Sequence, residues 1–254
     1  MPFRAIKTAT LVIITALGVL ASSAPFGAQR MDFEIGEFGE RFIVTLGGKL
    51  YDNLWVMTET KPPTRRNPSF PRDVALSADE TWRCVSCHGW DYRGAQGERA
   101  QFGRNKVFHG LKHLAGAERD VIIGKIRGPS HNYPEAALPD FVLEMLAAFI
   151  SRGQYDREAV LDGAGRVTGD VKRGRDIFEG ACMNCHQPDG RAYLTGEKGD
   201  RSSLGWIARH RPEQALHKIR NGVPGAEMLA LGFLEADQIR DLLAFLQTLD
   251  PDAN

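Results

Sequence analysis

The feature that most constrains this chain is a five-residue pattern, Cys-x-x-Cys-His, which occurs twice. The first copy runs from Cys84 to His88 and the second from Cys182 to His186. The chain has 4 cysteines, so the two copies use all of them: Cys84, Cys87, Cys182 and Cys185. Three uses of such a pattern have to be compared: a metal clip, a redox-active dithiol and a site of covalent haem attachment.

The spacing of the two copies disfavours the first two uses. A zinc ribbon places its cysteine pairs roughly 15–20 residues apart, far closer than these copies lie. A thioredoxin-like dithiol needs no histidine and sits in a βαβ unit, which neither copy's surroundings indicate. In c-type attachment the two thiols bond to the porphyrin vinyl groups and the adjacent histidine binds the iron. We therefore expect two covalently bound haem c groups, with His88 and His186 as proximal iron ligands.

The first residues predict export. Residues 1–24 combine a short basic start, an apolar run from Ala9 to Leu20 and small residues ending at Ala24, the layout of a secretory signal peptide. An uncleaved anchor is the alternative, because residues 8–28 carry no charge and are long enough to span a bilayer. We expect a periplasmic protein, associated with the membrane through this segment if the segment is retained.

The chain also repeats itself beyond the two motifs. A glycine and an aromatic residue four positions apart precede each motif, Gly47 with Tyr51 and Gly174 with Phe178. The tripeptide Lys-Ile-Arg follows each motif, and each half then closes with an apolar stretch of helical period. The periodic residues are Val142, Met145, Leu146, Phe149 and Ile150 in the first half and Ile239, Leu242, Leu243 and Leu246 in the second.

This plan resembles the class I cytochrome c domain, in which an N-terminal helix with a glycine and an aromatic residue crosses a C-terminal helix beside the haem. The whole chain resembles a tandem dihaem cytochrome c from Gly47 to Leu249, apart from one insertion. The resemblance implies an all-α fold of two class I cytochrome c-like helical domains, at residues 31–152 and 171–250. The Gly-rich polar residues 153–170 are expected to link them.

The insertion, residues 56–80, has no counterpart in the second half. Several prolines predict an irregular chain there. A capping-box pattern at Ser77–Glu80 predicts the start of a short helix that leads to Cys84. The basic residues of the insertion could dock an acidic redox partner, although a solvated loop is the simpler interpretation. These residues are Lys61, Arg65, Arg66 and Arg72.

Each iron needs a second axial ligand or has an open position. In the second half the resemblance points to Met228, and a methionine ligand raises the reduction potential. The first half has no methionine in the corresponding loop, but His131 follows His88 at nearly the offset at which Met228 follows His186. We therefore interpret His131 as the distal ligand of the first haem. The alternatives are His109, His113, Met145 and an open position.

These assignments favour an electron carrier over an enzyme. A bis-histidine first haem and a histidine–methionine second haem leave no position for a substrate, and the first has the lower potential. The expected partners are redox proteins and not nucleic acids, because 32 basic and 32 acidic residues balance to a formal net charge of +0.

Two other functions stay open. The first is a dihaem enzyme with its substrate at the first haem, resembling either thiosulfate dehydrogenases or peroxidases. Some of those dehydrogenases use a cysteine as distal ligand, and haem attachment leaves no cysteine for that role here. The second is a cytochrome subunit of a larger respiratory complex.

Overall fold

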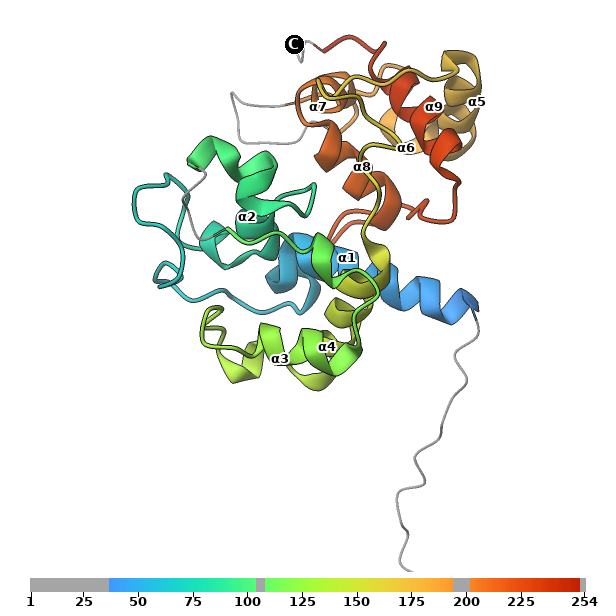
Figure 1. The fold of residues 1–254 in the computed structure, drawn as a ribbon. Coiled ribbons are helices and arrows are strands. Elements are labelled where there is room, and N and C mark those ends of the chain that lie inside the picture. The colour runs from blue at the N-terminus through green and yellow to red at the C-terminus, as the bar shows by residue number, and fades with distance from the viewer. Residues whose placement is uncertain (1–36, 104–107, 194–201, 252–254) are drawn as a thin grey trace, which may run out of the picture. The chain divides into compact units, whose positions relative to one another are not determined.

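The computed structural model describes residues 37–103, 108–193 and 202–251 (Figure 1). The predicted signal peptide, residues 1–24, lies outside them. The described part of the chain is helical and contains no β-strand, which confirms the all-α prediction. None of the helices in these ranges has both the length and the apolar character needed to cross a membrane.

The first half is built around two packed helices. The opening helix α1 (Glu37–Met57) packs against α4 (Asp140–Ala148), which continues as a π-helical turn, Phe149–Gly153. The short helix α2 (Cys84–His88) carries the first motif. Helix α3 (Arg119–Ile126) comes before the loop that leads to α4 and also packs against α4.

The second half repeats this arrangement with a shorter opening helix. Its opening helix α5 (Val171–Ala181) packs against the closing helix α9 (Ala236–Leu246). The second motif lies on α6 (Met183–His186). Helices α7 (Leu204–His210) and α8 (Pro212–Asn221) lie between the motif and α9 in the chain, and both contact α9.

The opening and closing helices of each half cross at a glycine. A Cβ atom on Gly47 would lie 2.0 Å from the carbonyl oxygen of Met145, and one on Gly174 would lie 1.9 Å from that of Asp241. No side chain fits at such distances, so glycine is required for the two backbones to approach this closely. Both glycines therefore have the role that the repeat predicted.

The aromatic residue one turn after each glycine fills the space beside the crossing. The ring centres of Tyr51 and Phe149 are 5.3 Å apart, and those of Phe178 and Phe245 are also 5.3 Å apart. The apolar stripes predicted for the closing segments face these crossings. Their buried members are Val142, Leu146, Phe149, Ile150, Ile239, Leu242, Leu243 and Leu246, and Met145 is partly buried.

The second half inserts one histidine into the core of the first. His217 of α8 is 0% exposed. Its ring lies among four aromatic rings, those of Tyr51, Trp90, Tyr92 and Phe149. Its Nε2 donates to the carbonyl oxygen of Gly48 at 3.1 Å, so its Nδ1 accepts from the Tyr92 hydroxyl at 2.8 Å. Both halves accordingly belong to one compact unit, Ile35–Asn254.

The residues predicted as a linker, 153–170, pack against both halves. Tyr155 is buried, and its hydroxyl donates to the carbonyl oxygen of Trp90 at 2.7 Å. The side chain of Gln247 on the other half donates to the carbonyl oxygen of Gly165 at 3.1 Å. This segment is therefore part of the contact between the halves, while the predicted domain boundaries stay predictions.

A buried carboxylate also joins the two halves. Asp52 of α1 is 1% exposed and accepts from Arg83 at 2.5 Å and from Lys218 of α8 at 2.6 Å. Burial alone raises the pKa of Asp52, but Lys218 and Arg83 outweigh that effect and lower it. The carboxylate thus ties the opening helix both to the residue before Cys84 and to the second half.

Replacing Asp52 with asparagine (Asp52→Asn) will lower the free energy of unfolding by about 3 kcal/mol, because two partly buried cations lose their shared partner. Urea unfolding of the holoprotein measures this change. The matched control is Asp176→Asn, which breaks the exposed Lys172–Asp176 pair. It should cost less than about 0.5 kcal/mol. Equal losses in the two variants would contradict a structural role for Asp52.

Acid will destabilise the protein through His217. Burial lowers the pKa of His217 to about 4, an effect that nearby Asp52 opposes and Lys218 reinforces, whereas an unfolded histidine titrates near 6.5. As the pH falls below about 6.5 the unfolded chain takes up this proton first, so stability present at neutral pH is lost towards pH 4. Between pH 7 and 4.5 the loss is about 2 kcal/mol. His217→Gln should reduce this loss of stability. If urea unfolding at the two pH values gives the same loss in the variant as in the wild type, this explanation is refuted.

Candidate functional site

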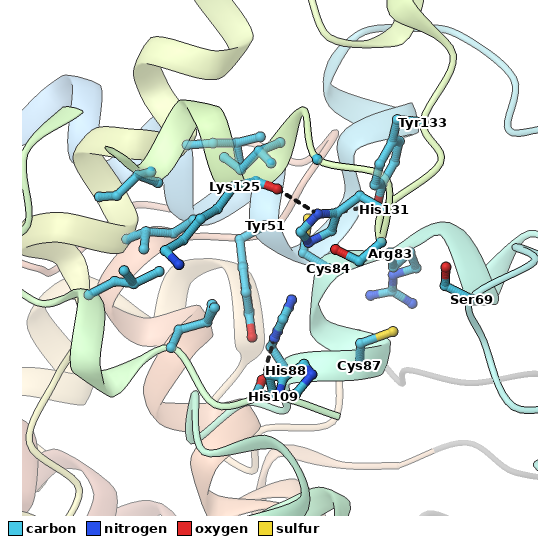
Figure 2. A pocket seen from close by; sticks show the side chains of 18 of the residues that line it. Tyr51, Ser69, Arg83, Cys84, Cys87, His88, His109, Lys125, His131 and Tyr133 are labelled. Carbon is cyan, nitrogen blue, oxygen red and sulfur yellow. Dashed lines mark hydrogen bonds between the residues drawn. The ribbon is translucent and has the colours of Figure 1, made fainter. Parts of the chain in front are cut away.

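A cavity of about 510 Å³ lies beside the first motif (Figure 2). This volume falls within the range of roughly 300–1,000 Å³ that is usual for cofactor pockets. Cys84, Cys87 and His88 of the motif line it together with apolar side chains from α1, α3 and α4. The apolar members include Leu54, Ile122, Ile126, Leu146 and Ile150. The site therefore combines reactive groups with a hydrophobic enclosure.

His88 and His131 face each other across this cavity. Their ring centres are 6.1 Å apart, and Figure 2 shows the ring of His131 above that of His88. His88 Nδ1 bonds to the carbonyl oxygen of His109 at 2.6 Å, and His131 Nδ1 bonds to that of Lys125 at 3.0 Å. A carbonyl oxygen only accepts, so each Nδ1 carries the proton and each Nε2 keeps its lone pair.

This pair fits axial ligation of one iron. Imidazoles bound to opposite sides of a metal ion have ring centres roughly 6 Å apart, since the metal–nitrogen bond is about 2 Å and the ring centre lies about 1 Å further. Burial lowers the pKa of His88 to about 4 and also lowers that of His131. Both rings are therefore neutral at physiological pH, which is the form that binds a metal.

The two thiols of the first motif lie in a buried, apolar environment. Cys84 and Cys87 are on one short helix, and neither forms a disulfide. Burial raises the pKa of Cys84 to about 11 and that of Cys87 to about 12.

The other candidate ligands of the first iron have different positions. His109 and His113 also line the cavity, but it is His131 whose ring pairs with that of His88. The backbone carbonyl of His109 instead accepts from His88. Met145 lies at the helix crossing beside Gly47, as expected of a core residue.

The insertion forms one wall of this cavity, a role that the sequence did not indicate. Asn67 and Phe70 line the cavity, and Asn67 Nδ2 donates to the backbone carbonyl of His131 at 3.0 Å. That contact joins residues 64 positions apart, so no local pattern could reveal it. After the end of α1 at Met57 the insertion is irregular, as predicted, until a 3₁₀ turn at Glu80–Trp82 that leads into α2.

One basic residue of the insertion is used internally. The guanidinium of Arg66 donates to three backbone carbonyls of the insertion, those of Pro71, Val74 and Leu76. These bonds close the irregular segment on itself. Arg66 therefore stabilises the irregular backbone of the insertion. Its guanidinium is used in these bonds and not in docking an acidic redox partner.

The second motif is more open than the first. Cys182 is half-buried and Cys185 is exposed. Burial raises the pKa of Cys182 to about 11 and lowers the pKa of His186. His186 Nδ1 is buried and has no hydrogen-bond partner among the described residues. Met228 lies half-buried in the loop between α8 and α9. Neither His186 nor Met228 lines the cavity beside the first motif. The pairing of His186 with Met228 stays a prediction.

Comparison with known proteins gives a family match in the second half. Residues 171–250, which contain the second motif and helices α5 to α9, match the family model of cytochrome c. The match supports a c-type cytochrome with covalently bound haem c and a haem-based role in electron transfer. A search among curated proteins finds no match.

Proposed function

We propose that this protein is an exported, periplasmic dihaem cytochrome c that passes single electrons between redox partner proteins. The observation that carries the proposal is the pairing of His88 with His131 across a cavity lined by Cys84 and Cys87. It supports a haem site in the first half, in addition to the haem c that the family match supports for the second. Haem c supplies reversible one-electron chemistry at its iron.

Each half contributes its own set of residues. Cys84 and Cys87 attach the first haem, and His88 and His131 ligate its iron. The second set is Cys182, Cys185, His186 and Met228. Hydrogen bonds from Nδ1 to backbone carbonyls make the two imidazoles of the first site stronger electron donors. Two imidazoles would favour ferric iron and a thioether would favour ferrous iron, so the first site would have the lower reduction potential and would pass electrons to the second.

An enzyme would need an open position at one iron. The ring of His131 pairs with that of His88, and its Nδ1 is held by the Lys125 carbonyl. Thiosulfate dehydrogenase-like ligation needs a further cysteine, and the two motifs use all 4. A subunit of a larger respiratory complex would use the same residues and differ only in its partners.

The thiols give a direct count of the haems. The denatured holoprotein should carry two haems per chain and react with iodoacetamide at none of its cysteines. A Cys182→Ser, Cys185→Ser double variant should keep one haem, so that the pyridine haemochrome signal halves while the first site stays loaded. Mass spectrometry counts the haems and the alkylated cysteines on each chain. Two free thiols in the wild-type holoprotein would contradict the dihaem assignment.

The axial ligands can be identified by near-infrared magnetic circular dichroism. The oxidised wild type should show one bis-histidine and one histidine–methionine signal. His131→Ala should remove the bis-histidine signal and make one of the two haems high-spin, because that iron loses its distal ligand. His113→Ala is the matched control, since His113 lines the same cavity, and it should leave both signals intact. A high-spin first haem in the wild type would favour the enzyme instead.

A further inference from the structure

We propose that the insertion, residues 56–80, is a clamp that positions His131 and would keep its imidazole on the first iron. Asn67 and Ser69 are its positioning residues. The inference rests on the proposed function, because it takes His131 as the distal ligand. It goes further by assigning what holds that ligand in place and what would release it.

The insertion is hydrogen-bonded to the ligand loop, the loop that carries His131, at two successive residues. Asn67 Nδ2 donates to the carbonyl oxygen of His131 at 3.0 Å. The next residue, Asn132, donates from its own Nδ2 to the hydroxyl oxygen of Ser69 at 2.7 Å. Two successive residues of the ligand loop are therefore bonded to two nearby residues of the insertion.

A third hydrogen bond is made by the next residue of the ligand loop. The hydroxyl of Tyr133 donates to the carbonyl oxygen of Trp82 at 2.6 Å, and the indole of Trp82 donates to the carbonyl oxygen of Arg65 at 2.7 Å. Trp82 is 1% exposed, so this connection lies in the core. The ligand loop is thus attached at three consecutive residues to the segment from Arg65 to Trp82.

The amide of Asn67 is itself held in one orientation. Asn67 is 8% exposed, its backbone N–H donates to Thr81 Oγ1 at 3.0 Å, and its Oδ1 accepts from the backbone N–H of Ser69 at 2.9 Å. Because Oδ1 is the acceptor in that bond, Nδ2 is the group that faces the His131 carbonyl. Contacts outside the His131 loop therefore set the orientation of this donor.

The clamp is fixed to the motif as well. Phe70 and Phe108 pack with ring centres 5.4 Å apart in a small apolar cluster, and Cys87 lies partly buried against that cluster. The same short stretch of the insertion therefore contacts both the loop that carries His131 and the apolar cluster beside an attachment thiol. Movement of the loop away from the cavity would break contacts on both sides.

The backbone at Asn132 gives the loop its local shape. Asn132 has a φ of +58°, in the left-handed region, which asparagine adopts more readily than most residues with a side chain. Such a conformation persists where surrounding contacts impose it. The bonds at His131, Asn132 and Tyr133 supply those contacts, and without them the loop would relax and carry the imidazole away from His88.

Two variants test the clamp in the holoprotein. Asn67→Asp keeps the size of the side chain and the acceptor for Ser69, but it removes the donor to His131. Ser69→Ala removes the acceptor for Asn132 at an exposed position, where folding should tolerate it. The control is Ser77→Ala in the same insertion, whose hydroxyl donates to Glu80 at 2.7 Å.

The readout is a cyanide titration of the ferric protein, followed through loss of the bis-histidine near-infrared signal. Apparent cyanide affinity rises with the fraction of chains in which His131 is off the iron. We expect a rise of about fivefold for Ser69→Ala, the factor that one lost hydrogen bond carries, and a larger rise for Asn67→Asp. Ser77→Ala should bind cyanide as the wild type does.

The outcomes separate this inference from the proposed function. If the wild type shows the bis-histidine signal and Ser69→Ala and Asn67→Asp both titrate like Ser77→Ala, the clamp is refuted and the ligand assignment stands. If the wild type lacks that signal, the ligand assignment fails and the clamp fails with it. Should Asn67→Asp not fold, the result for Ser69→Ala decides.

Discussion

The close approach of the opening and closing helices at a glycine is the contact on which each half depends. Gly47 brings α1 against the backbone of α4, and Gly174 does the same for α5 and α9. Tyr51 then lies at the first crossing, lines the cavity and donates to the carbonyl oxygen of Gly89 at 2.5 Å. Gly89 directly follows His88, so the helix crossing helps to fix the position of the proximal histidine.

The polar groups buried between the halves determine how the halves dock. Apolar contacts around Phe149 provide most of the driving force but little directional information. His217 and Asp52 are costly to bury unless each of their polar atoms finds its partner, and here the partners come from both halves. A shift of α8 along the first half would leave an imidazole and a carboxylate unpaired. The two groups therefore favour a single arrangement.

The reactive groups of the first site could be predicted from local patterns, whereas its walls could not. The motif predicted Cys84, Cys87 and His88, and the offset along the chain predicted His131, which the structure places opposite His88. Asn67 carries no such signal, because its bond to His131 crosses 64 residues and an isolated asparagine has no periodicity. The environment of His217 was missed for the same reason, since its contacts come from residues 48–149. The pairing of Met228 with His186 stays a prediction drawn from the resemblance.

The burial of His217 among the rings of the first half bears on whether the halves can be separated. The bond from His217 to Gly48 spans 169 residues and closes a loop that includes most of the first half. Closing such a loop costs conformational entropy, which the contacts around His217 offset. The aromatic core of the first half is therefore complete only when α8 is docked on it. A fragment that ended before α8 would leave the rings of Tyr51, Trp90 and Tyr92 without this partner.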